Sequence, residues 1–216
     1  MSSIAAAPTA SAGTRRVLAD VIARPSSRAR AFALDAGLVI AGATIVALLA
    51  QVEIPLWPVP ITGQTLGVIV VGAALGAWRG AAALTTYMLV GLAGLPVFAG
   101  FTGTVAAIGK PSFGFVIGFI FSAFVAGWFA ERAWDRRPGL AFLGFAAASV
   151  VPFLFGIPYL AFVLNVTLGL ELTFWQILEA GLIPFIIGGL VKAAIAALII
   201  PGAWALVRKV DATKKA

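Results

Sequence analysis

The sequence predicts an all-α integral membrane protein with six transmembrane helices and cytoplasmic N- and C-termini. Of its 216 residues, 62% are hydrophobic and 11% are charged, whereas globular domains average about 45–50% apolar and about 25% charged residues. Charge-free apolar runs recur along the chain, and a helix needs about 20 such residues to cross the hydrocarbon core. The runs lack the alternation of a β-barrel strand, so they predict helices. This composition excludes a disordered chain and an ordinary soluble enzyme.

Six segments are predicted to span the bilayer, and loops rich in Pro, Gly or charge separate them. These segments are 32–51, 63–78, 80–98, 112–131, 140–164 and 180–207. Together they make a transmembrane domain over 32–207, between a basic tail over 1–31 and a second basic tail over 208–216. Within the first tail, residues 15–22 are compatible with a short interfacial helix.

The positions of Lys and Arg orient the predicted bundle. With the N-terminus inside, all of the 15 Lys and Arg residues except Lys110 and Lys192 lie on the cytoplasmic side. Cytoplasmic loops carry an excess of Lys and Arg, so both termini are predicted to lie inside. The net charge of +7 is then explained by membrane orientation, and no nucleic-acid partner is expected.

The residue types that are absent limit the chemistry. The chain contains no cysteine and no histidine, which removes disulfides, the common zinc, haem and iron–sulfur ligand sets, and Ser–His or Cys–His catalytic pairs. We therefore predict no catalytic residue, no metal site and no cofactor, and the protein is not expected to be an enzyme.

The loops on the predicted outer side are more elaborate than those on the inner side. Residues 51–62 contain three prolines, which exclude a regular helix. Residues 99–111 are rich in glycine, and 165–179 are expected to hold a short surface helix around Phe174–Leu178. Such an outer face suggests the mouth of a ligand site.

Lys192 is the strongest single candidate for function, because a charge inside a membrane span is costly and usually functional. We expect Pro184, Gly188 and Gly189 to interrupt the last span, so that a helix begins near Leu190 with Lys192 in its first turn. The free N–H groups of that turn and the ammonium would then bind a carboxylate or a phosphate. The alternative is a lysine that extends to the interface or pairs with an acidic residue.

Other features leave alternatives open. Gln64, at the outer start of the second span, offers its amide to a polar neutral ligand or to a neighbouring helix. Glycines at four-residue spacing, such as Gly114 and Gly118, predict close helix packing. Aromatic residues of the outer half, among them Tyr87 and Phe98, fit a membrane-interface belt or a pocket wall, and composition favours the belt.

Four motifs of the sequence, in the order in which they occur, resemble those of a known protein family. These are 59–66 (Val-Pro-Ile-Thr-Gly-Gln-Thr-Leu), 91–99 (Gly-Leu-Ala-Gly-Leu-Pro-Val-Phe-Ala), 111–119 and 181–192. They resemble the BioY family, the biotin-specific substrate-binding (S) components of energy-coupling-factor (ECF) transporters, in order over about 36–207. The resemblance implies a six-helix bundle in the bacterial cytoplasmic membrane that captures biotin outside with high affinity and delivers it inside.

The resemblance also implies a set of binding residues. Carried over by position, Lys192 would meet the valerate carboxylate of biotin. Gln64, Tyr87, Phe98 and the 101–103 loop would lie near its ring system. The full predicted ligand-binding set is Lys192, Gln64, Tyr87, Phe98, Phe101, Thr102, Gly103, Ser112 and Gly189. Gly189 stands where the family has an acidic residue, and Ser112-Phe113 replace a Thr-Gly pair. Another vitamin or small carboxylate is therefore the alternative ligand.

Partners follow from the same resemblance. It implies a transmembrane coupling protein and two ATPase subunits, and the lack of a nucleotide-binding motif in this chain fits that division of labour. A face of small residues such as Ala43 and Ala47 would contact the coupling protein or a second copy of the chain. A non-transporting scaffold is disfavoured, because it would gain little from a lysine in the bilayer.

Overall fold

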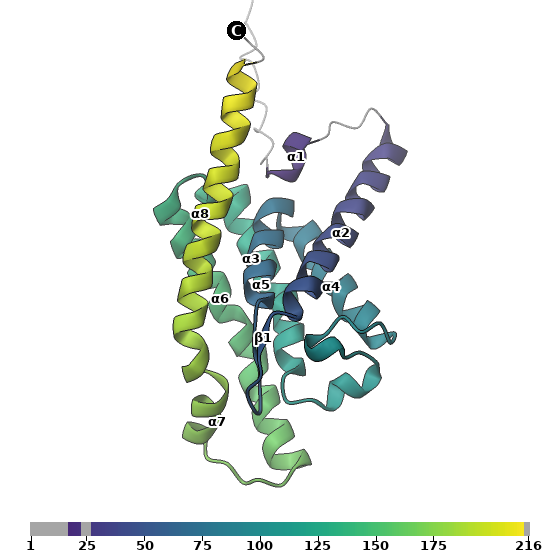
Figure 1. Cartoon of the computed structure of the whole chain (residues 1–216), viewed down its shortest axis with the longest axis vertical. Helices are drawn as coiled ribbons and strands as arrows, with labels where there is room; N and C mark the ends of the chain where they lie inside the picture. The colour runs from purple at the N-terminus through teal and green to yellow at the C-terminus, as the bar shows by residue number, and fades with distance from the viewer. Residues whose placement is uncertain (1–16, 23–26, 214–216) are drawn as a thin grey trace, which may run out of the picture.

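The computed structural model describes residues 17–22 and 27–213, which form a bundle of helices with one small hairpin (Figure 1). The long helices are α2 (Arg28–Ala50), α3 (Gln64–Leu75), α4 (Ala77–Leu92), α5 (Phe113–Glu131), α6 (Pro138–Ala161) and α8 (Ile183–Thr213). The shorter elements are α1 (Ala19–Ile22), β1 (Glu53–Ile54), β2 (Ile61–Thr62), η1 (Ala99–Phe101), η2 (Val105–Gly109), η3 (Trp134–Arg136), η4 (Phe162–Thr167) and α7 (Phe174–Gly181).

The bundle has two distinct ends. α1, the start of α2 and the end of α8 lie together, and we call this the terminal end (Figure 1). The β1–β2 hairpin, η1, η2 and α7 lie towards the opposite end, which we call the loop end. The first and last long helices extend past the predicted domain limits of 32 and 207, because α2 begins at Arg28 and α8 ends at Thr213.

Four helical segments of the described chain are long and apolar enough to cross a membrane. They are 28–50, 113–131, 138–167 and 174–210. The predicted spans over 63–78 and 80–98 correspond to shorter helices, α3 with 12 residues and α4 with 16. Gly76 joins them with a φ of +90°, a conformation that glycine adopts readily. α4 ends at Leu92, earlier than predicted, and Gly94 with a φ of +109° turns the chain into the loop.

Small residues set how closely the helices approach. A Cβ added to Gly72 of α3 would lie 2.3 Å from the carbonyl oxygen of Ala123 in α5. A Cβ added to Gly118 of α5 would lie 2.6 Å from the Cα of Pro152 in α6. The close packing that the glycine spacing predicts is therefore confirmed at both interfaces, and α5 lies between α3 and α6 in direct backbone contact with each.

The prediction of an interrupted last helix is wrong, because α8 runs without a break from Ile183 to Thr213. Pro184 is the second residue of α8, where a missing N–H breaks no intrahelical hydrogen bond. Gly188 and Gly189 are accommodated within the helix, and a Cβ on either would meet no atom within 4 Å. Lys192 therefore lies in the third turn of α8 and not in the first turn of a separate helix.

The loop end contains two local structures that fix its shape. The short helix expected around Phe174–Leu178 is confirmed as α7, whose first turn is capped by Thr173 in a capping box with Gln176. The proline-rich segment forms the β1–β2 hairpin, in which Glu53 pairs with Thr62. The hairpin brings Thr62 to the start of α3.

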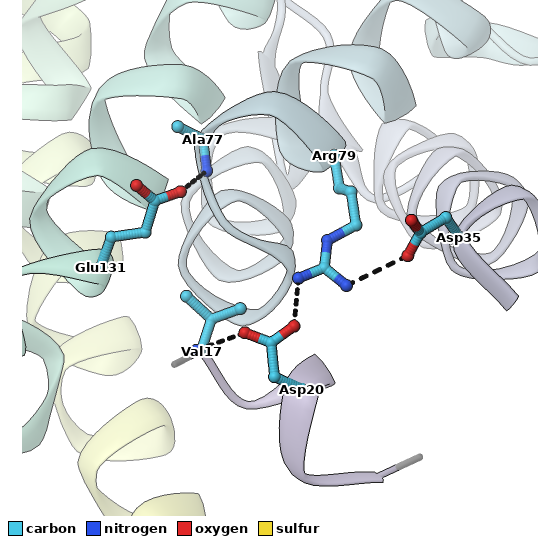
Figure 2. Close-up of polar contacts among 6 residues, drawn as sticks. All are labelled: Val17, Asp20, Asp35, Ala77, Arg79 and Glu131. Carbon is cyan, nitrogen blue, oxygen red and sulfur yellow. Dashed lines mark hydrogen bonds and ion pairs between the residues drawn. The ribbon is translucent and has the colours of Figure 1, made fainter. Parts of the chain in front are cut away.

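A network of charges fixes α1 to the terminal end (Figure 2). Arg79 of α4 donates hydrogen bonds to Asp20 of α1 and, at 3.2 Å, to Asp35 of α2. The carboxylate of Glu131 accepts a hydrogen bond of 2.9 Å from the N–H of Ala77 at the start of α4. These contacts join four helices at this end.

A buried carboxyl group also lies at the terminal end. Asp135 of η3 is fully buried, and its Oδ2 accepts a hydrogen bond of 2.5 Å from Nε1 of Trp204 in α8. The guanidinium of Arg136 lies 4.5 Å from the centre of the Trp204 ring. Burial raises the pKa of the Asp135 carboxyl above its usual value, although the Trp204 hydrogen bond and Arg136 act against this. These contacts hold η3 against α8.

Candidate functional site

A cavity of about 250 Å³ opens at the loop end, and the hairpin, the 98–112 loop and four helices line it. Its volume is slightly below the range of about 300–1,000 Å³ that is common for small-molecule sites. Most of the wall is apolar and includes Trp57, Val59, Phe113, Phe115, Phe119, Phe153 and Phe185. The polar side chains on the wall are Glu53, Thr62, Gln64, Thr65, Thr102, Lys110, Ser112, Ser149 and Lys192. An apolar wall with a few polar groups suits a small amphipathic ligand.

Lys192 lies on the cavity wall and is held by two neutral oxygens. Its Nζ donates a hydrogen bond of 2.6 Å to the carbonyl oxygen of Thr62 and one of 2.9 Å to Oγ1 of Thr65. Among the described residues, the ion pairs involve Arg79 and not Lys192. An ammonium has three donors, so one remains for a ligand. A partly buried cation with only neutral partners attracts an anion strongly, since burial weakens screening by water.

Gln64 also lines the cavity, and its amide is fixed at both ends. Its Nε2 donates to the hydroxyl oxygen of Tyr87 at 2.7 Å, and its Oε1 accepts from the hydroxyl of Thr62 at 2.7 Å. Tyr87 is 1% exposed and lies behind the wall, with its ring edge-to-face against Phe98 at 5.4 Å. The interhelical hydrogen bond considered for Gln64 is therefore present, on a side chain that also faces the cavity.

Gln51, at the end of α2, fixes the loop that covers one side of the cavity. Its Oε1 accepts from the N–H of Phe101 at 2.9 Å, and its Nε2 donates to the carbonyl oxygen of Phe98 at 3.2 Å. Phe98 and Thr102 are also joined by a pair of backbone hydrogen bonds. The backbone of this loop is thus held by α2 before any ligand is bound.

The structure brings most of the predicted binding residues to one cavity. Those on its wall are Lys192, Gln64, Phe98, Thr102, Ser112 and Gly189. Three predicted residues are not on the wall. Tyr87 supports Gln64 from behind, and Phe101 is 72% exposed. Gly103 packs against the 91–95 turn, where an added Cβ would lie 2.3 Å from the carbonyl oxygen of Leu95.

Sequence reasoning missed other cavity residues, notably Thr62 and Thr65, which hold Lys192. Their spacing of three residues at the polar start of a span is a signal that could have pointed to them. Glu53 and Lys110, also on the wall, lie in loops whose contacts the sequence does not reveal. Within the described ranges, no group of three or more Asp and Glu residues is placed to hold a metal ion.

Comparisons with known proteins find a family and relatives for this chain. The model of the BioY family matches residues 23–209. The biotin transporter BioY of Rhizobium etli is 39% identical over 174 residues, which cover 77% of this chain and 87% of that protein. The biotin transporter BioY of Thermotoga maritima is 38% identical over 154 residues, with 69% of this chain and 83% of that protein covered.

A solved structure shares the fold. The crystal structure of the S-component for biotin from an ECF-type ABC transporter superposes with a TM-score of 0.60 over 82% of this chain and 93% of that one. Sequence identity across this match is 24%.

Proposed function

This chain belongs to the BioY family, and from that premise we propose that it captures biotin at the loop end for uptake, as the S component of an ECF-type transporter. One observation carries the proposal: an apolar cavity that holds the amide of Gln64 and the ammonium of Lys192, which has no counterion among the described residues. Biotin matches this wall, because it joins one carboxylate and one ureido group through an apolar body.

The cavity suggests a role for each polar group. We assign the valerate carboxylate to Lys192, whose ammonium has one donor left beyond its hydrogen bonds to Thr62 and Thr65. The ureido group needs both donors and acceptors, which Gln64, Thr102 and Ser112 offer. Phe98 and the other aromatic residues of the wall would pack against the ring system and the methylene chain.

The alternative keeps the transporter class and changes the ligand to another vitamin or small carboxylate. It is favoured by Gly189, which lines the cavity beside Lys192 with no side chain at the place where the family has an acidic residue. A ligand with a bulkier group near its carboxylate would fit that space.

We further propose that α2, α3, α4, α5, α6 and α8 all cross the bacterial cytoplasmic membrane, with the loop end outside and both termini inside. Basic residues of the terminal end support this orientation: Arg28 begins α2, Arg132 follows α5, and Arg208 lies in the last two turns of α8. The chain contains no cysteine, so single cysteines at Gly169 and Lys209 test the orientation directly. A membrane-impermeant maleimide added to whole cells should label the first and not the second, and the reverse result would overturn the orientation.

The proposed partners are a transmembrane coupling protein and two ATPase subunits, with a second copy of the chain as a further partner. The relatives are transporters by name, and the structural neighbour comes from an ECF-type ABC transporter. The chain itself would supply ligand recognition, and its partners would supply the energy for release. Purification of the tagged chain from its own membranes, followed by mass spectrometry of what remains bound, tests these partners.

Ligand-induced stabilisation tests the function. Ligand-free protein in nanodiscs of phosphatidylcholine is heated with biotin, with biotin methyl ester, and with other carboxylate vitamins. A ligand at 100 times its Kd stabilises the native state by about 2.7 kcal/mol, so biotin should raise Tm and the ester should raise it far less. Stabilisation by a different vitamin but not by biotin would replace the proposed ligand with the alternative.

A further inference from the structure

A second lysine lies on the rim of the cavity. Lys110 follows η2, is exposed, and contributes to the cavity wall. Its Nζ donates a hydrogen bond of 3.0 Å to Oγ1 of Thr102, which lines the same cavity. This neutral contact leaves the positive charge of Lys110 uncompensated, since the ion pairs among the described residues do not include it. The cavity therefore carries one partly buried ammonium and one exposed ammonium.

The charges of the loop end make Lys110 distinctive. Three carboxylates belong to the loop end: Glu53 on the cavity wall, Glu171 in the loop before α7, and Glu179 on α7. Within the described ranges, the cations of this end are Lys110 and Lys192, and Lys192 is only partly accessible. An anion that approaches the mouth is repelled by these carboxylates and attracted chiefly by Lys110.

We propose that Lys110 is the capture residue of this site: its exposed ammonium draws a ligand carboxylate to the mouth and sets the association rate constant, while Lys192 sets the dissociation rate constant. This rests on the proposed function only in that the ligand carries a carboxylate. Charges at the rim of a binding site act mainly on the association rate and its salt dependence, whereas buried charged partners act mainly on dissociation.

Rates of biotin binding test the proposal. Trp57 lines the cavity, so tryptophan fluorescence in a stopped-flow instrument can follow binding to the full chain in phosphatidylcholine nanodiscs. Wild type, Lys110→Gln, Lys110→Arg and Lys209→Gln are compared at ionic strengths of about 0.01 M and about 1 M, where the screening length is about 30 Å and about 3 Å. Lys209→Gln removes the same charge from the terminal end.

We expect Lys110→Gln to lower the association rate constant about 3- to 10-fold at low salt, with a dissociation rate constant within about 2-fold of wild type. The difference should vanish at high salt, Lys110→Arg should restore the wild-type rate, and Lys209→Gln should match wild type. The association of biotin methyl ester should not depend on Lys110.

Any of four results would overturn the proposal. Equal association rates for wild type and Lys110→Gln at low salt would remove the capture role while leaving biotin binding intact. A decrease that persists at high salt, or that appears equally with the ester, would point to the packing of the loop through Thr102. A folded wild type that binds no carboxylate would overturn both the capture role and the proposed function.

Discussion

Lys192 at the loop end is partly buried and Asp135 at the terminal end is fully buried, and the surroundings of these two ionisable side chains differ. Lys192 faces a cavity and is held by two neutral oxygens. Asp135 is 0% exposed and is packed beneath Trp204, with Arg136 over the same ring. The comparison teaches that burial of a charge does not by itself indicate a ligand site. A ligand site is indicated when the charged group also faces a cavity and lacks a counterion.

The two residues also differ in what they connect. Lys192 joins α8 to the hairpin and to α3 through contacts that a ligand can supplement. Asp135 joins η3 to α8 through the hydrogen bond from Trp204 and is not among the residues that line the cavity. We therefore expect changes at Lys192 to alter binding and changes at Asp135 to alter stability, and four variants test this separation.

Lys192→Met should have the largest effect on binding. Loss of the partner of a desolvated carboxylate costs about 2–5 kcal/mol, so biotin affinity should fall by about 30-fold to more than 1,000-fold. The ligand-free protein should remain folded with an equal or higher Tm, since methionine removes a partly buried ammonium that has no counterion among the described residues. Calorimetric titration and a thermal melt measure both; retention of affinity within about 3-fold would contradict the assigned role.

Asp135→Ala should lower stability and leave biotin affinity unchanged, which is the opposite of the effect expected for Lys192→Met. It leaves the indole N–H of Trp204 without its acceptor, which should lower the free energy of unfolding by about 1–3 kcal/mol. Biotin affinity should match wild type. Glu179→Ala, which removes an exposed carboxylate, is the matched control and should leave Tm unchanged. A large loss of biotin affinity in Asp135→Ala, at a temperature where the variant is folded, would show that Asp135 and the cavity are coupled.

Tyr87→Phe should weaken binding modestly without opening a cavity in the core. The hydroxyl oxygen that orients the amide of Gln64 is lost, and a hydrogen bond of this kind contributes about 0.5–1.5 kcal/mol. Affinity should therefore fall about 2- to 10-fold. Because Tyr87 acts through Gln64, the same change in a Gln64→Leu background should add almost nothing. Full additivity in that double-mutant cycle would show that Tyr87 acts by another route.

Asp135→Asn should have the smallest effect, visible as a pH dependence. Burial raises the pKa of Asp135, so the folded protein keeps this proton to a higher pH than the unfolded chain does. The resulting stability is complete below the unfolded pKa and is lost as pH rises through the folded pKa. Wild type should therefore lose stability relative to Asp135→Asn as pH rises from about 4 to about 8. A Tm difference that does not change with pH would contradict the raised pKa.

Much of the fold follows from the sequence because apolar run length is a local property. The runs that contain α2, α5, α6 and α8 stand out by hydropathy alone, and α7 by its turn signals. The ends of α8 do not follow in the same way. Pro184 and Gly189 have helix-breaking tendencies that a single sequence cannot weigh against the packing of a long helix, so a break was predicted where none exists.

The site is less accessible to sequence reasoning because its contacts are long-range. The oxygen that Lys192 contacts on Thr62 is 130 positions away, and Gln51 contacts the carbonyl of Phe98 across 47 positions. The residue types Lys192 and Gln64 could be chosen from chemistry and from the family resemblance. Two further contacts depend on how the chain folds in three dimensions. These are the contact of Tyr87 with Gln64 and that of Lys110 with Thr102.

The length of α3 has a consequence for the path of the ligand. The helix has 12 residues, so it rises only about 18 Å from the cavity at its first turn to Gly76 near the terminal end. A hydrocarbon core is about 30 Å thick. In the proposed orientation a captured molecule has already descended well into the membrane before any energy is spent. The proposed partner proteins would then have to open only a short inner barrier beneath the ligand, and not a passage across the whole bilayer.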